Sequence, residues 1–383
     1  MDALPLARSC VAVAAANLLQ HRLRLVAALS GIAVALLLLL LQISVLEAAR
    51  TKVTALYDDF NFDIAILPDI YQYLMSVGTI NSVDLEIARS TGDVADTFGL
   101  NVENVHWMEL PSKHMTYNLL IGIDDPGSFV RDPDIRAGWA QLRSPHAILA
   151  DAYSQKSVGP ISPGTDAQIG DTRVHIVGQF KLGLFFYAEG ATIARNVNFY
   201  GFTGGDPSLI SIGLVRLKPG VSPDKARADL IKALPSNTLV LTRDELLHDE
   251  RAYFLSTKPV GIMLYISMII ASLVGAAIIV QVLSTEVSNR MGEYAMFKAM
   301  GADIPFVYGI GMAQAGLLGL GGLVPAIVIG ALILSFVALR THLDTFVGPS
   351  LMMTMLAISL TLSVAAGAAV IRRVQRADPA ELF

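Results

Sequence analysis

Four long apolar segments constrain this chain more than any other feature of its sequence. They span about residues 25–46, 259–283, 304–339 and 350–371. A helix needs roughly 20 apolar residues to cross the ~30 Å hydrocarbon core of a lipid bilayer, and each segment reaches that length. We therefore expect an α-helical membrane protein with four transmembrane helices. A large two-lobed α+β extracytoplasmic domain is expected between the first helix and the second.

Arginines near both ends of the chain indicate how these helices are oriented. Three precede the first apolar segment and three follow the last: Arg8, Arg22, Arg24, Arg372, Arg373 and Arg376. Positive residues accumulate in short cytoplasmic segments, so both termini are expected in the cytoplasm. Residues 1–24 would form a cytoplasmic amphipathic segment and residues 372–383 a cytoplasmic tail. The first apolar segment exceeds the roughly 7–15 residues of a signal-peptide core, so we expect a retained anchor.

The segment of residues 47–258 alternates between short strands and helices. Near its end, residues 210–217 read as a strand, residues 222–234 as a helix and Thr238–Thr242 as a second strand. A similar β-α-β unit is predicted near the start, over about residues 62–109. A β-rich insert at about residues 116–205 separates the two units. We expect a β-α-β, porter-like lobe that contains an inserted β-rich lobe.

Several classes of protein are disfavoured by the sequence. The formal net charge of −5 argues against nucleic-acid binding, and the single cysteine, Cys10, excludes an internal disulfide. The motifs G-x-x-x-x-G-K-[ST], H-E-x-x-H and G-x-S-x-G do not occur. Adjacent acids such as Asp58-Asp59 and Asp249-Glu250 are expected in solvated turns and helix ends. We expect no catalytic residue, no metal site and no cofactor, and therefore no enzyme.

The polar residues of the apolar segments are few. Gln42, Gln281 and Gln314 are the main exceptions, and no row of ionisable residues lies at membrane depth. Ion channels and proton-coupled transporters usually place ionisable residues there, so both are disfavoured.

The third apolar segment is rich in glycine. Its glycines are Gly309, Gly311, Gly316, Gly319, Gly321, Gly322 and Gly330. Because small residues let helix backbones approach closely in lipid, Gly316, Gly319 and Gly322 are expected to pack against a neighbouring helix or a second copy of the chain. Pro325 is expected to kink this helix or adjust its tilt. The alternative is the ordinary enrichment of glycine in membrane helices.

Residues 284–303 separate the second apolar segment from the third and are expected in the cytoplasm as a coupling helix. Six residues are the candidates for contact with a partner: Glu286, Arg290, Glu293, Phe297, Met300 and Gly301. The charged residues are three or four positions apart and can pair on one helical face. Phe297 and Met300 belong to an apolar stripe, and Gly301 would end the helix. Such a helix either lies on the membrane or presses into a partner protein.

This segment resembles the E-x-x-x-R-x-x-E-x-x-x-x-x-A-x-G signature of FtsX/MacB-like ABC transporter permeases, with Ala299 and Gly301 at its end. The basic tail, with Asp378-Pro379-Ala380, is similar to the tail of that family. Within the family, residues 212–221 and 293–301 are most similar to the DevC branch of glycolipid-exporter permeases. The segment Phe185-Phe186-Tyr187 differs from the small polar residues that are usual at this place in the DevC branch. The identity of the substrate therefore stays open.

The resemblance implies the permease subunit of an ABC exporter that works as a homodimer with a cytoplasmic ABC ATPase dimer. ATP hydrolysis would take place on the separate ATPase subunit. A periplasmic membrane-fusion adaptor and a TolC-like outer-membrane channel would complete a tripartite pump for a lipid, a glycolipid or another amphipathic cargo. The membrane would be the inner membrane of a Gram-negative-type bacterium. The alternative is an FtsX-like transmembrane lever that regulates a periplasmic cell-wall hydrolase. An anchored periplasmic enzyme is disfavoured, because no catalytic constellation was found.

Overall fold

The computed structural model describes residues 3–110, 112–183, 187–289, 292, 304–343, 345 and 347–376. The chain forms two compact units. The helical unit comprises Met1–Ala48, Met263–Arg340 and Asp344–Phe383, and the α/β unit comprises Ala49–Ile262 and Thr341–Leu343.

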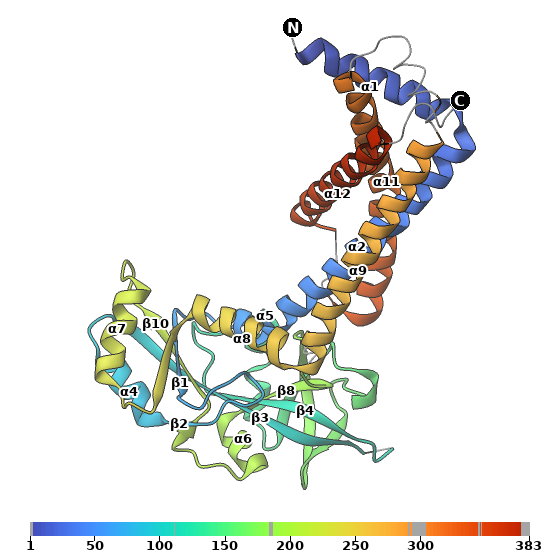
Figure 1. The fold of residues 1–383 in the computed structure, drawn as a ribbon. Coiled ribbons are helices and arrows are strands. Elements are labelled where there is room, and N and C mark those ends of the chain that lie inside the picture. The colour runs from blue at the N-terminus through green and yellow to red at the C-terminus, as the bar shows by residue number, and fades with distance from the viewer. Residues whose placement is uncertain are drawn as a thin grey trace. The chain divides into compact units, whose positions relative to one another are not determined.

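The long helices of the chain are shown in Figure 1. They are α1 (Ala3–Gln20), α2 (Arg22–Val53), α9 (Pro259–Ser288), α11 (Ile304–Thr341) and α12 (Pro349–Arg376). Four of them, α2, α9, α11 and α12, are long and apolar enough to cross a membrane, with mean hydropathy between 1.9 and 2.6. The four apolar helices predicted from the sequence are therefore present.

The core of the helical unit forms around α2. Its residues Ile32, Leu36 and Leu39 follow one another at spacings of four and three, which places them on one helical face. All three are buried together with Ile279 of α9 and Leu318 of α11. The shorter helix α1 packs against the N-terminal part of α11, where Cys10 and Ala14 form an apolar cluster with Ile310.

The α/β unit begins with α3 (Ala55–Asp58), β1 (Ile64–Pro68), β2 (Ile80–Asn81), α4 (Ser82–Ser90), β3 (Val94–Glu109) and β4 (Met115–Ile123). It continues with α5 (Pro133–Gly138), β5 (Ala147–Asp151), β6 (Asp166–Ile169), β7 (Thr172–Phe180), β8 (Gly190–Arg195) and α6 (Asn196–Thr203). It ends with β9 (Leu209–Ile210), β10 (Ile212–Leu217), α7 (Pro223–Ala233), β11 (Thr238–Thr242) and α8 (Arg243–Thr257).

Nine strands form one sheet in the order β11-β1-β10-β3-β4-β8-β5-β7-β6. Strand β3 is 16 residues long and pairs first with β10 and then with β4. Its last residues, 107–109, also pair with β6 at the far end of the order. This pairing closes β3, β4, β8, β5, β7 and β6 into a six-stranded barrel. The two lobes predicted from the sequence are thus joined in one sheet, because β3 runs through both.

The barrel is filled by one apolar cluster to which each of its six strands contributes. The strand residues in this cluster are Val105, Trp107, Leu120, Ile148, Ala150, Ala167, Ile169, Val174, Ile176 and Ala194. The indole N–H of Trp107, a fully buried residue, donates to the carbonyl of Val158 at 2.9 Å. Its polar atom is thereby satisfied, as buried polar groups require.

The β-α-β unit predicted near the end of the domain is confirmed as β10, α7 and β11. Two details differ from the sequence reading. Ser211 separates β9 from β10, because its backbone N–H donates to Asn101 Oδ1 instead of continuing a ladder. Helix α7 begins at Pro223, one residue after the start predicted at residue 222.

The first predicted unit is present as β1, α4 and the start of β3. Helix α4 begins after Asn81, whose side chain accepts from the N–H of Val83, while the Asp84 carboxylate accepts from the Asn81 N–H. Figure 1 shows α4 beside α7, and both cover the β1, β10 and β11 end of the sheet.

Candidate functional site

Of the six residues predicted to couple to an ATPase, one lies in the described part of the chain. Glu286 is near the end of α9, and its exposed fraction is 6%. Five others lie outside the described residues: Arg290, Glu293, Phe297, Met300 and Gly301. Their pairing on one helical face stays a prediction.

The glycines predicted to pack helices occupy different surroundings. A Cβ atom on Gly322 of α11 would lie 2.6 Å from Ile32 Cγ2 and 3.3 Å from the Ala33 backbone nitrogen, both on α2. A Cβ atom on Gly319 would lie 2.9 Å from Ser363 Cβ on α12. Gly316 has no such neighbour within 4 Å in the described residues. Gly319 and Gly322 therefore lie where three helices meet, whereas contact between Gly316 and a second copy stays a prediction.

Two further glycines of α11 also lie against α2. Cβ atoms on Gly321 and Gly330 would meet Leu29 and Leu40 of α2 at 2.8 Å and 2.5 Å. Pro325 lies between these positions, inside α11, and the helix continues on both sides of it. Close contact between α11 and α2 thus extends over several turns.

A polar contact joins α2 to α9. The side-chain amide of Gln42 donates to Ser267 Oγ at 2.8 Å and to the carbonyl of Leu264 at 3.2 Å. Gln42 was one of the three polar exceptions in the apolar segments, and here it links two helices.

Replacing Gln42 by Leu should lower the free energy of unfolding of the helical unit by about 1 kcal/mol, the size of a hydrogen bond between membrane helices. The measurement is the temperature at which buried Cys10, the single cysteine, reacts with a thiol-specific dye in detergent. Ser30→Ala is the matched control, because among the described residues Ser30 Oγ bonds only the carbonyl of Val26 in its own helix. Equal shifts in both variants would contradict a stabilising role for Gln42.

The α/β unit contains a buried cluster of one carboxyl group and three tyrosines, here called the tyrosine–glutamate cluster: Glu250, Tyr57, Tyr71 and Tyr187. Glu250 of α8 is fully buried. Tyr57 of α3 donates to its Oε1 at 3.0 Å, Tyr71 contacts the same oxygen, and Tyr187 donates to Oε2 at 3.3 Å. Burial raises the pKa of Glu250 to about 7. The sequence reading of Glu250 as a solvated acid was wrong, because its partners come from three distant segments.

Further tyrosines extend this cluster to Lys258, the residue before α9. The ring of Tyr73 lies 5.8 Å from that of Tyr187 and stacks on that of Tyr253 at 5.2 Å, centroid to centroid. The ammonium group of Lys258 lies 3.7 Å from the Tyr73 ring centroid, a cation–π contact. Lys258 is the residue between α8 and α9, so the aromatic group reaches the point where α9 begins.

Two arginines of α8 hold it against the end of α2 and the segment that follows α2. Arg243 donates to the carbonyls of Tyr57 and Phe60 at 3.1 and 3.0 Å. Arg251 donates to Thr54 Oγ1 at 3.1 Å and to the carbonyl of Arg50 at 3.3 Å. Besides the cluster, α8 is therefore held at two further points, by Arg243 on α3 and the residues after it and by Arg251 at the end of α2.

Two more acids of this unit are shielded from solvent. Burial, with neighbouring Asp132, raises the pKa of Asp59 to about 7. Asp151 is fully buried and accepts from the backbone N–H groups of Tyr153, Leu182 and Gly183. Burial raises the pKa of Asp151, while those hydrogen bonds oppose the rise. Asp151 thus fixes the backbone after β7, a structural role.

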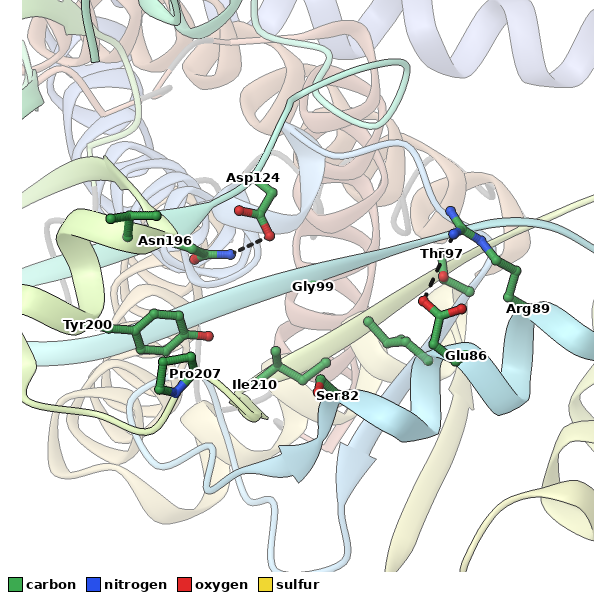
Figure 2. Close-up of a pocket in the computed structure, with 12 residues that line it drawn as sticks. Ser82, Glu86, Arg89, Thr97, Gly99, Asp124, Asn196, Tyr200, Pro207 and Ile210 are labelled. Carbon is green, nitrogen blue, oxygen red and sulfur yellow. Dashed lines mark hydrogen bonds and ion pairs between the residues drawn. The ribbon is translucent and has the colours of Figure 1, made fainter. Parts of the chain in front are cut away.

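A cavity of about 490 Å³ opens between α4, α6 and β3. Figure 2 shows Asp124, Asn196 and Tyr200 on one side of Gly99, with Glu86 and Arg89 on the other. Asn196 Nδ2 donates to Asp124 Oδ2 at 2.9 Å. The residues that line the cavity include no histidine or cysteine, so it offers hydrogen bonds and charge rather than a nucleophile and base of that kind.

A metal centre was not expected from the sequence. Among the described residues, no group of three or more His, Cys, Asp or Glu side chains is arranged to hold a metal ion.

Comparison with known families bears on the part of the chain that holds the last three apolar helices. Residues 265–379 match the family described as FtsX-like permease C-terminal. This FtsX-like permease region includes most of α9, the predicted coupling segment, α11 and α12. The match supports the FtsX/MacB family predicted from the sequence, whose permeases work with ABC ATPase partners. It covers 115 of 383 residues, and the α/β unit lies almost wholly outside it.

The solved structures that are similar to this chain align with low sequence identity and a low TM-score. The periplasmic region of MacB from Actinobacillus actinomycetemcomitans aligns at 11% identity and a TM-score of 0.35, over 48% of this chain and 90% of that one. The extracellular domain of the noncanonical ABC-type transporter YknZ from Gram-positive bacteria aligns at 12% and 0.33, over 47% and 98%. A domain of a protein described as a permease from Porphyromonas gingivalis aligns at 15% and 0.31, over 54% and 96%. Likeness at this level carries no functional argument. No curated protein matches the chain.

The tyrosine–glutamate cluster is the main feature that sequence reasoning missed. Helix α8 itself had a signal: Thr242 and Glu245 form a capping box, with Thr242 Oγ1 accepting from the Glu245 N–H and Glu245 accepting from the Thr242 N–H. A helix started there places Leu246, Glu250 and Phe254 four residues apart on one face, which the structure buries.

Proposed function

We propose that this chain is the permease subunit of a MacB/DevC-like ABC exporter. The observation that supports this most is the match of residues 265–379 to the FtsX-like permease family, because it includes the predicted coupling segment. In this proposal the four apolar helices cross the inner membrane of a Gram-negative-type bacterium. Both termini are cytoplasmic, and residues 47–258 form the periplasmic domain.

The coupling segment joins α9 to α11, and both of these helices pack against α2. Gly275 of α9 would place a Cβ atom 3.3 Å from Leu39 of α2, and Gly322 of α11 contacts Ile32 of the same helix. The chain passes from α2 to α3 across Thr54, and from α8 to α9 across Lys258. These short links offer a covalent route by which helix movements reach the α/β unit.

The proposed partners follow from this role. A cytoplasmic ABC ATPase dimer hydrolyses ATP, and two copies of this chain form the membrane part. A periplasmic membrane-fusion adaptor and a TolC-like outer-membrane channel would receive a lipid, a glycolipid or another amphipathic cargo. Movement of the α/β unit would expel the cargo, so passage through the helical unit is not required.

An FtsX-like lever is the second candidate, because the matched family is equally compatible with it. In that case the same movement would switch on a periplasmic cell-wall hydrolase, and no cargo would be exported. An adaptor bound to the purified complex supports the exporter, whereas a bound hydrolase or its activator supports the lever.

Charge reversal at Glu293 tests the coupling assignment. In Glu293→Lys we expect ATPase activity stimulated by this chain to fall roughly tenfold or more, because loss of one buried interfacial charge partner costs about 2–5 kcal/mol. The measurement is ATPase activity of the reconstituted complex, together with the amount of the chain in the membrane. Glu103→Lys, at an exposed position of β3, is the control for charge reversal alone. Unchanged stimulation in Glu293→Lys would refute the assignment.

A further inference from the structure

In the described part of the chain, the carboxyl group of the tyrosine–glutamate cluster has no positively charged partner. Glu250 is fully buried, and no described basic residue forms an ion pair with it. A buried carboxylate is costly unless it is paired, and the usual response is to take up a proton. The surroundings of Glu250 therefore favour its neutral form.

The number of hydrogens available to the oxygen–oxygen contacts around Glu250 also indicates a protonated carboxyl group. Glu250 Oε1, Tyr57 Oη and Tyr71 Oη form a triangle: the two Tyr57 contacts measure 3.0 and 2.8 Å, and Tyr71 also contacts Oε1. Each contact needs one hydrogen, and the two tyrosines supply two. A protonated carboxyl supplies the third and closes the ring. An ionised carboxylate leaves one pair of oxygens facing each other without a hydrogen.

We propose that Glu250 is a proton-binding site, and that release of its proton loosens α8 from the α/β unit. The group facing it from α3 is Tyr57, from the segment between β1 and β2 it is Tyr71, and from the segment before β8 it is Tyr187. The backbone N–H of Leu74 also donates to the carboxyl group. Loss of the proton leaves an ionised carboxylate buried among these groups, and separation of α8 from the unit lets water reach that charge and removes the cost of burying it.

The titration range supports a physiological role. Burial raises the pKa of Glu250 to about 7, and the hydrogen bonds from Tyr71, Tyr57 and Tyr187 lower it by less. Burial also raises the pKa of Tyr57 and Tyr71 well above its usual range, so their hydroxyls keep their protons. The cluster therefore exchanges one proton near neutral pH, at the carboxyl group.

Helix α8 leads across Lys258 into α9, the helix that precedes the predicted coupling segment. Weaker contacts between α8 and the rest of the α/β unit would therefore alter how movement of α9 is transmitted to that unit. This consequence rests on the proposed function, whereas proton binding at Glu250 does not. Both experiments below are done without an ATPase, so failure of one proposal is distinguishable from failure of the other.

The first experiment follows the C=O stretching band of protonated carboxylic acids in infrared difference spectra of the full-length chain in detergent. We expect the band to disappear with a midpoint near pH 7 in the wild type. Glu250→Gln should remove one component and Asp59→Asn another, because both acids titrate in this range. A band of unchanged amplitude in Glu250→Gln, or no band in the wild type at pH 5, would overturn the proposal.

The second experiment measures the consequence by hydrogen–deuterium exchange of peptides from residues 243–257, corrected for the intrinsic effect of pH. Opening of α8 should be about tenfold more frequent at pH 8 than at pH 6 in the wild type, as linkage to one such proton requires. Glu250→Gln, a neutral isostere that also brings an N–H donor, should abolish that difference. Asp249→Asn and His248→Gln, at exposed neighbouring positions of α8, should retain it. A difference that persists in Glu250→Gln, or is absent from the wild type, would refute the proposal.

Discussion

Gly322→Leu should destabilise the helical unit by about 3 kcal/mol, the upper end of the range for added volume in a packed core. A Cβ atom at this position would already lie 2.6 Å from Ile32 Cγ2, and the backbone of α2 lies 3.3 Å away, so neither neighbour can withdraw easily. A leucine adds three further carbons in the same direction. The two helices must therefore separate or rotate.

The temperature at which Cys10 becomes reactive reports this change. Cys10 is the single cysteine, is 4% exposed and packs against Ile310 of α11. We expect a fall of roughly 5–10 °C in Gly322→Leu, from the usual relation between free energy and melting temperature for a unit of this size. Gly316→Leu, six residues earlier in the same helix and without a neighbour within 4 Å among the described residues, should shift by less than about 2 °C. Equal shifts would contradict the packing of α11 on α2.

The stability of the α/β unit should fall as the pH rises from 5 to 8. The pKa of Glu250 is about 7 in the folded chain against an ordinary 4.5, so the folded state binds the proton more tightly than the unfolded state. The stabilisation is complete below pH 4.5 and is lost as the pH rises through 7. Between pH 5 and 8 this amounts to about 2–3 kcal/mol, since one pKa unit corresponds to about 1.4 kcal/mol. Asp59 adds a loss of similar size in the same direction, because its pKa is also about 7 in the folded chain, against an ordinary 3.8.

Urea unfolding of the full-length chain, followed by tryptophan fluorescence, measures this loss. Both tryptophans, Trp107 and Trp139, belong to the α/β unit, so the signal reports that unit alone. Glu250→Gln should remove about half of the pH dependence and raise the stability at pH 8, and Asp59→Asn should remove most of the rest. A wild type that is more stable at pH 8 than at pH 5 would reverse the sign and refute the account of both acids.

The parts of the fold that were predictable depend on local sequence. Apolar length alone marks α2, α9, α11 and α12, because crossing a bilayer requires that length. Alternation and turn residues marked β10, α7 and β11. The closing of the barrel was not predictable, because it depends on the pairing of Trp107 with Ile169, about sixty residues later in the chain. Nothing in the local pattern of either strand encodes that contact.

The candidate site likewise has features that local sequence predicts and features that depend on contacts between distant residues. Gly319 and Gly322 could be selected from composition, since small residues favour close helix contact in lipid. Which neighbour each one meets, and why Gly316 meets none in the described residues, depends on the rotation of α11. The burial of Glu250 could not be read from its exposed neighbour Asp249. Its tyrosine partners lie about 60 to 190 positions away in the chain.

Co-purification of the full-length chain from native membranes in mild detergent, with mass spectrometry of stoichiometric partners, tests the central claim most directly. The proposed permease role predicts an ABC ATPase in the complex, and a periplasmic adaptor beside it for the exporter. Glu293→Lys should lose the ATPase, whereas Glu103→Lys should keep it. Absence of any ATPase from the wild-type complex would contradict the assignment of this chain as an ABC permease subunit.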